Sequence, residues 1–162
     1  MSWQLHRVDD RLIHGQVVVA YGQSLRPRRI WVADEAAAAS EWERDLLLAA
    51  APGVEVRVVT VAEAAAGYAA ETAAAGPAFL LVRNLEAALA LVEAGAPVPS
   101  FNLGGLHYAP GKFKVNEYVY LDDRDLGAAR ALLARGVALQ VQDVPGSRPQ
   151  PLSTLVPALA TP

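Results

Sequence analysis

The sequence contains no cysteine and only three histidines among its 162 residues. Without cysteine there is no disulfide framework and no thiolate metal site. The three histidines show no spacing that would place two ligands on one helix face, so we expect no metal centre. Neither a Walker loop nor a G-x-G-x-x-G segment occurs, and we therefore expect no nucleotide cofactor.

Charge and hydropathy exclude further classes of protein. The net charge of -3 provides no basic field for nucleic acid or for an anionic membrane, so no nucleic-acid partner is expected. No apolar run reaches the roughly 18 residues of a membrane-spanning helix, and "MSWQLHRVDD" lacks the apolar core of a signal peptide. We therefore expect a cytoplasmic protein that forms a single domain over residues 1–162.

Short β-branched runs alternate with alanine- and leucine-rich runs along the chain. The expected strands are residues 3–8, 29–33, 54–60, 78–83, 100–104, 117–121 and 137–142. The expected helices are residues 15–25, 40–51, 61–73, 85–94 and 123–134. Ser40 with Glu43 and Thr60 with Glu63 fit capping boxes, and Asn84 is placed to cap the helix after it. The alternation predicts a three-layer α/β domain, with a mostly parallel seven-stranded sheet and helices on both faces.

A candidate site lies in the loop after the first expected strand. In an open parallel sheet, ligands bind outside the carboxyl ends of the strands, near the point where strand order reverses. His14 ends the loop "DDRLIH", just before a helix that begins near Gly15. Backbone N–H groups at a helix start and the guanidinium of Arg11 both favour an anion. These parts suit a histidine that carries a phosphoryl group.

The same residues also fit a purely structural interpretation. A histidine between a strand and a helix is often a satisfied structural residue. The acidic pair Asp9 and Asp10 would then serve loop and capping chemistry, with Arg7 and Arg11 as surface partners. The residues by themselves leave both interpretations open.

Four segments resemble a known family. "RVDDRLIHGQV", residues 7–17, resembles the signature of the enzyme IIB components of the mannose/fructose/sorbose family of the bacterial phosphoenolpyruvate-dependent sugar phosphotransferase system. "RIWVADE", "FNLGGLHYAPGK" and "QVQDVPG" resemble further recurring segments of this family, in the same order and at suitable spacing. The resemblance extends over essentially the whole chain and implies a single α/β domain with a mostly parallel seven-stranded sheet.

The resemblance implies a phosphoryl carrier, a protein-N(π)-phosphohistidine–sugar phosphotransferase. His14 would accept a phosphoryl group from the phosphohistidine of a IIA protein or domain. It would then pass the group to a sugar that enters through the membrane IIC and IID components. Arg11 corresponds to the nearby arginine of the family and would stabilise the phosphoryl oxygens. We expect Asp10 to orient Arg11 or to fix the tautomer of His14, and Asp9 to turn the chain.

Glycines are expected to line the phosphoryl site. Gly15 begins the helix after His14, whereas Gly104 and Gly105 follow the fifth strand, where backbone N–H groups can approach an anion. Asn102 and Lys112 of the same segment would add donors.

His107 lies in that segment too, but it lacks a helix start and a close arginine. We expect it at the rim of the site, and we expect His6, inside the first strand, to be structural.

Two other functions remain open from the sequence. The first is a regulatory phosphohistidine module without sugar transport, which the neighbouring genes would distinguish. The second is a phosphometabolite-binding domain with no covalent step, which the missing glycine-rich fingerprint disfavours. The resemblance also implies association with the membrane permease, leaves a homo-oligomer open, and leaves the sugar unidentified because the sugar pocket of this family belongs to the membrane component.

Overall fold

The structure is a computed structural model that describes residues 2–160. The strands are β1 (Trp3–Val8), β2 (Arg29–Ala33), β3 (Glu55–Val59), β4 (Ala78–Val82), β5 (Ser100–Leu103), β6 (Phe113–Lys114), β7 (Tyr120–Leu121), β8 (Ala138–Val141) and β9 (Gln150–Pro151). The helices are the π-helix η1 (Gln16–Tyr21), α1 (Gly22–Leu25), α2 (Glu35–Ala39), α3 (Glu41–Ala50), α4 (Val61–Ala73), α5 (Leu85–Glu93), α6 (Asp123–Ala134), α7 (Leu152–Leu155) and the 3-10 helix η2 (Pro157–Leu159).

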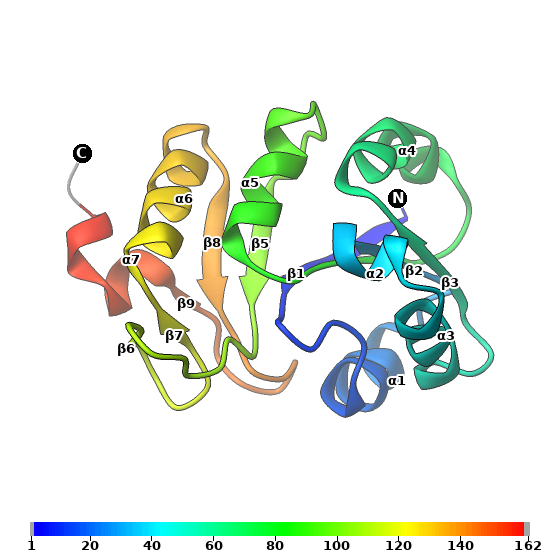
Figure 1. Cartoon of the computed structure of the whole chain (residues 1–162), viewed down its shortest axis with the longest axis horizontal. Helices are drawn as coiled ribbons and strands as arrows, with labels where there is room; N and C mark the ends of the chain where they lie inside the picture. The colour runs from blue at the N-terminus through cyan, green and yellow to red at the C-terminus, as the bar shows by residue number, and fades with distance from the viewer. Residues whose placement is uncertain (1, 161–162) are drawn as a thin grey trace.

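The main sheet has seven strands in the order β3-β2-β4-β1-β5-β8-β9. Every pairing in it is parallel except that of β8 with β9. Strands β2, β3 and β4 lie on one side of β1, and β5 and β8, which come later in the sequence, lie on its other side (Figure 1). Strand order therefore reverses beside β1, and a ligand site is expected outside the carboxyl end of that strand. This confirms the predicted fold class.

One strand of the main sheet differs from the prediction. The segment 117–121 does not join it, because the backbone of that segment is bonded elsewhere. Leu106 N–H donates to the Tyr118 carbonyl, Tyr120 N–H donates to the Leu106 carbonyl, and β7 pairs antiparallel with β6 in a separate hairpin. The seventh place is taken by β9, whose two residues are too few to give a sequence signal. Its proline is tolerated because β9 lies at the edge of the sheet.

The helix starts follow the predicted capping residues with one exception. The Thr60–Glu63 capping box is complete, and Asn84 accepts from the Ala87 N–H. Ser40 accepts from the Glu43 N–H, but the return bond of the box is absent because the Glu43 carboxylate binds an arginine instead. The expected helix 15–25 is present, although its first part is a π-helix, a form that often occurs at functional sites.

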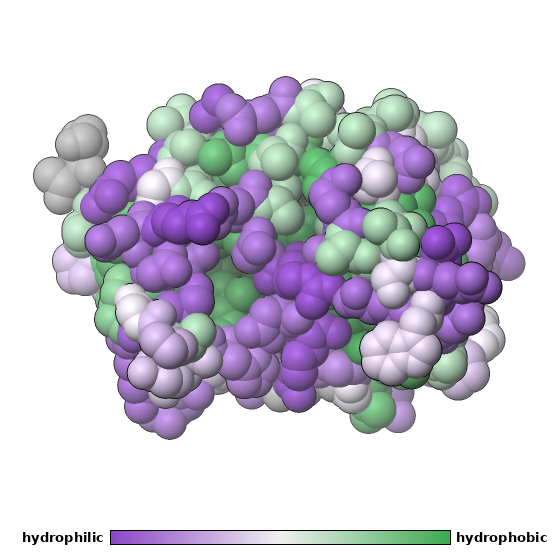
Figure 2. Space-filling view, in the orientation of Figure 1, coloured by the Kyte–Doolittle hydropathy of each residue, from purple (hydrophilic) through white to green (hydrophobic). Residues whose placement is uncertain are grey.

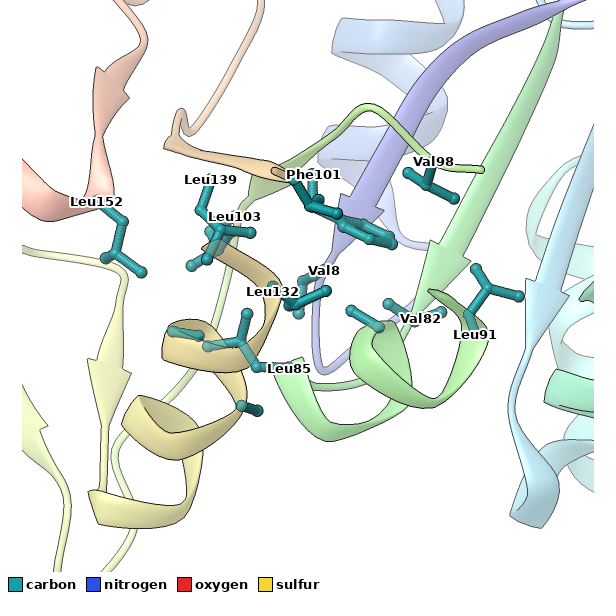
Figure 3. Close-up of a cluster of buried hydrophobic side chains, with 14 of the residues drawn as sticks. Val8, Val82, Leu85, Leu91, Val98, Phe101, Leu103, Leu132, Leu139 and Leu152 are labelled. Carbon is teal, nitrogen blue, oxygen red and sulfur yellow. The ribbon is translucent and has the colours of Figure 1, made fainter. Parts of the chain in front are cut away.

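Two apolar layers hold the sheet between helices. On one face, α4, α5, α6 and α7 cover side chains of the strands, and Figure 3 shows Phe101, Leu103 and Leu139 of the sheet beside Leu85 and Leu132 of the helices. On the other face, η1, α2 and α3 cover β1, β2 and β4. All five residues of β4 are buried, as expected for a central parallel strand. None of the helices within residues 2–160 is both long and apolar enough to span a membrane.

Candidate active site

The loop after β1 turns sharply and returns His14 toward the end of the strand. The Leu12 N–H donates to the Asp9 carbonyl at 3.0 Å, and Leu12 has φ 58°, which is uncommon for a bulky residue. The side chains of Leu12 and Ile13 are buried in the apolar layer of η1. This burial offsets the backbone strain, so two apolar anchors determine where His14 lies.

A buried ion pair supports the loop from below. Arg7 and Asp9 are both fully buried, and Arg7 Nε lies 3.2 Å from Asp9 Oδ2. Arg7 donates its other hydrogen bonds to four neutral acceptors, the Tyr21 hydroxyl (3.2 Å), Asn102 Oδ1 (2.6 Å), and the carbonyls of Gln142 (3.0 Å) and Asp143 (3.1 Å). A charge without such partners would be costly to bury. The guanidinium is therefore a fixed part of the site.

Asp9 holds the imidazole of His14. Its Oδ2 lies 2.7 Å from His14 Nε2, and the carboxylate also accepts the N–H groups of Arg11 (3.1 Å) and Gly105 (3.3 Å). Burial raises the pKa of Asp9, but the hydrogen bond and charge of His14, the charge of Arg7 and the Arg11 N–H together outweigh it, so the pKa is lowered. Asp9 is thus a carboxylate that only accepts, and His14 donates through Nε2. When the imidazole is neutral, the lone pair is therefore on the other ring nitrogen, Nδ1.

The carboxylate that holds His14 is therefore not the one expected. Asp10 contacts neither His14 nor the Arg11 side chain. Its two oxygens bind His107 instead, one at the ring Nδ1 and one at the backbone N–H, each at 2.7 Å. The expectation for Asp10 is corrected: successive side chains at the end of a strand point in opposite directions, so Asp9 points to the buried Arg7 and Asp10 toward the loop after β5.

The exposure of the two expected functional side chains also differs. His14 was expected in an exposed loop, but its side chain is only 11% exposed, because Asp9 draws the ring against the end of β1. Arg11 is exposed, and among the described residues no carboxylate pairs with its guanidinium. The loop thus carries an exposed cation, Arg11, three residues before a recessed imidazole.

The glycines serve packing more than anion binding. The Gly104 N–H donates to the Val8 carbonyl at 2.9 Å and the Gly105 N–H donates to Asp9, so neither donor is available to an anion, contrary to expectation. A methyl group on Gly104 would overlap the Arg7 guanidinium, which explains why glycine is required there. A methyl group on Gly15 would meet no atom within 4 Å, so that side of the helix start is open.

The two extra donors expected from the loop after β5 are engaged as well. Asn102 accepts from Arg7 and donates to the Gln142 side chain at 2.8 Å. Lys112 Nζ lies 2.7 Å from the Asp125 carboxylate at the start of α6, so it holds the loop and does not face His14. The loop still reaches the site, because the Asp10 N–H donates to the Gly105 carbonyl at 2.9 Å.

All four segments that carry the family resemblance meet at this edge of the sheet. Residues 101–112 and 140–146 reach Arg7 and Asp9 through the contacts described above. The segment "RIWVADE" contributes Asp34, which binds Arg83 at 2.9 Å, and Arg83 Nη1 lies 3.5 Å from the Asp10 carbonyl. The loops after the first, second and fifth strands therefore lie together, as predicted. Figure 2 shows polar side chains gathered near the middle of the view, where the loop after β1 lies in Figure 1.

Arg7 and Asp9 are the functional residues that the sequence interpretation missed. The available signal was the period of two along β1, because Leu5, Arg7 and Asp9 alternate with His6 and Val8 and share the face that η1 covers. A charge at an inward position demands a partner, and the carboxylate two residues later is the nearest candidate. The positive φ of Leu12 has no sequence signal.

The fold and the site together define an α/β protein with a carboxylate-held histidine at the point where strand order reverses. Residues 3–160 match the family described as "PTS system sorbose subfamily IIB component". The chain therefore belongs to this family of phosphotransferase IIB components, which confirms the resemblance.

Curated relatives and a solved structure agree. The chain is 38% identical over 141 residues to the PTS system mannose-specific EIIAB component of Escherichia coli (strain K12), covering 86% of this chain and 44% of the relative, so it spans less than half of that protein. It is 35% identical over 145 residues to the PTS system sorbose-specific EIIB component of Klebsiella pneumoniae, covering 89% and 88%. The crystal structure of the IIBSor domain of the Klebsiella pneumoniae sorbose permease superimposes with a TM-score of 0.88 at 32% identity, covering 100% of both chains.

Proposed function

We propose that His14 is the phosphoryl carrier of a sugar phosphotransferase system and that its Nδ1 forms the bond to phosphorus. The observation that supports this is the 2.7 Å contact between Asp9 and His14 Nε2. A carboxylate on Nε2 keeps the proton there, so Nδ1 is the nucleophilic nitrogen. A IIB family chain with this arrangement needs no metal or cofactor for the transfer.

The first step moves the phosphoryl group between two imidazoles. The lone pair of His14 Nδ1 forms a bond to phosphorus while the P–N bond of the phosphohistidine on the IIA partner breaks, and its electron pair returns to the partner's ring. The phosphorylated His14 ring keeps its proton on Nε2 and carries a positive charge. The Asp9 carboxylate balances that charge, and Arg7 keeps Asp9 ionised and in place.

In the second step a sugar hydroxyl oxygen attacks phosphorus. The bond to Nδ1 breaks, its electron pair returns to His14, and the hydroxyl proton leaves to a base outside this chain. Arg11 is the cation placed to accompany the phosphoryl oxygens through both steps, because it is exposed and unpaired among the described side chains. The helix start at Gly15 supports it, since first-turn N–H groups and the helix dipole favour an anion by roughly 0.3–1 kcal/mol.

The partners of this cycle are a phosphorylated IIA protein or domain and the membrane IIC and IID components, with a sugar as the final acceptor. The chain would work at the cytoplasmic face of the membrane, associated peripherally with the permease. The names of the two relatives given above specify different sugars, mannose and sorbose. The sugar is thus determined outside the features that this chain shares with both.

Labelling by a phosphorylated IIA protein tests the proposal. We expect wild-type protein and His107→Ala to be labelled and His14→Ala to remain unlabelled, with the label lost in acid and retained in base, as a phosphoramidate requires. Arg11→Lys should slow labelling, because it keeps the charge but loses the bidentate fork, and Arg11→Ala should slow it further. Labelled His14→Ala would refute the assignment. Addition of sugar and membranes with the IIC and IID components should remove the label, and a label that no sugar discharges would indicate the regulatory function instead.

A further inference from the structure

Helix α3 is apolar on two sides, although only one of them faces the core. Leu47 is buried against the sheet, as expected for a surface helix. Trp42, Leu46 and Ala49 are spaced i, i+4 and i+7 and are all exposed, Trp42 to 74% and Leu46 to 50%. This spacing places them along one face. We call these three residues the α3 ridge.

The α3 ridge adjoins further apolar surface. Where α3 ends, a groove of about 290 Å³ separates it from η1, lined mainly by Val17, Val18, Ile30, Ala51, Pro52 and Val54. Val19 of η1 is also more than half exposed. Figure 2 shows pale and green side chains protruding over α1 and α3 at the lower right of the view. Exposed apolar side chains gathered in one part of a surface are a feature of interaction sites.

The α3 ridge is connected to the phosphoryl site. Glu43, next to Trp42, binds Arg83 at 2.6 Å, and Arg83 reaches the Asp10 carbonyl in the loop that carries His14. On the other side of the groove, η1 starts two residues after His14, and the Val18 N–H donates to the His14 carbonyl at 3.0 Å. A partner seated on His14 would bury about 800 Å², or 20–30 residues, on this chain. Because Arg83 contacts both Asp10 of the loop and Glu43 of α3, the start of α3 lies within reach of such an area.

We propose that the α3 ridge is the docking surface for the phosphorylated IIA partner. This inference rests on the proposed function of His14. Tryptophan is enriched at the centres of protein interfaces, and Trp42 is 74% exposed on this ridge. Helix α3 carries three carboxylates and one arginine, a balance that is unfavourable next to the anionic lipid headgroups around a membrane component. A second copy of this chain on the α3 ridge would stand beside His14 and obstruct the donor.

Three variants of α3 test the inference by the rate of labelling over a range of concentrations of phosphorylated IIA. Leu46→Ser and Trp42→Ala should each lower kcat/KM roughly tenfold or more through a higher KM, with kcat unchanged. Leu48→Ser is the matched control, because Leu48 is on the same helix and 44% exposed, but it points away from the ridge. It should label like the wild type, and thermal unfolding checks that all three variants fold.

The possible outcomes separate this inference from the proposed function. Wild-type protein that phosphorylated IIA does not label overturns both. If the wild type is labelled normally and Leu46→Ser and Leu48→Ser have the same KM, the assignment of the α3 ridge as the docking surface is overturned, and the proposed function of His14 is not. Slower discharge to sugar in permease membranes, with unchanged labelling, would assign the ridge to the membrane component. A loss of dimers by sedimentation in Leu46→Ser would assign it to self-association, and either result overturns the inference.

Discussion

Replacing Asp9 by asparagine tests the most unusual feature of the site, a buried carboxylate shared by an arginine and by the histidine that we propose as the phosphoryl acceptor. Asp9 accepts four hydrogen bonds, from Arg7, Arg11, His14 and Gly105. Asparagine has one oxygen in place of two, so at least one of these donors loses its acceptor. The buried Arg7 also loses its only countercharge among the described contacts. Removing one partner of a buried pair costs roughly 3–5 kcal/mol.

The adjacent residue provides a control for this substitution. Asp10 also binds a histidine at 2.7 Å, but its side chain is 32% exposed and that of His107 is 55% exposed. A contact of this kind between partly exposed polar side chains contributes about 0–1 kcal/mol. Asp10→Asn should therefore change the free energy of unfolding by less than about 1 kcal/mol, although it removes the same charge from the next position.

Two measurements compare these variants. In thermal unfolding, Asp9→Asn should lower the melting temperature by roughly 10 °C, whereas Asp10→Asn should unfold close to the wild-type temperature. Labelling by phosphorylated IIA, measured well below the melting temperature, should slow at least roughly tenfold in Asp9→Asn, because the positive charge of phosphorylated His14 loses its carboxylate. If Asp9→Asn were as stable as Asp10→Asn and were labelled at the wild-type rate, the role assigned to the buried network would be wrong.

Two further predictions concern stability. Burial lowers the pKa of His6 to about 4 from its ordinary 6.5. The unfolded chain therefore binds the proton more readily than the folded protein. As the pH drops from 6.5 to 4, the free energy of unfolding should fall by about 3 kcal/mol. Urea titrations of the wild type and His6→Phe across this range should show that the variant lacks this part of the dependence, and equal slopes would contradict the assignment. Gly104→Ala should lower the free energy of unfolding by about 1–3 kcal/mol, because its methyl group overlaps the buried Arg7. Gly15→Ala places a methyl group in open space at a helical φ and should be neutral or slightly stabilising. A neutral Gly104→Ala would show that Arg7 moves freely.

The elements that the sequence predicts well are those whose signals are local. Thr60 with Glu63 and Asn84 begin helices because their side chains satisfy N–H groups only three residues away. The apolar run of β4 identifies a central strand because a parallel strand is buried on both faces. Alternation of such strands with helices is sufficient for the fold class, and the loop after the first strand locates His14 at the edge of the sheet where strand order reverses.

Tertiary structure decided which residues surround His14. Asp9 and Asp10 are adjacent and chemically identical, yet one is buried against Arg7 and the other binds the exposed His107. Arg7 is buried because acceptors from Tyr21, Asn102, Gln142 and Asp143, up to 136 residues away, converge on it. The cost of burying a charge depends on partners that only the folded chain assembles. For this reason the sequence alone identified His14 as the candidate at this edge of the sheet, and the fold decided which carboxylate contacts its ring.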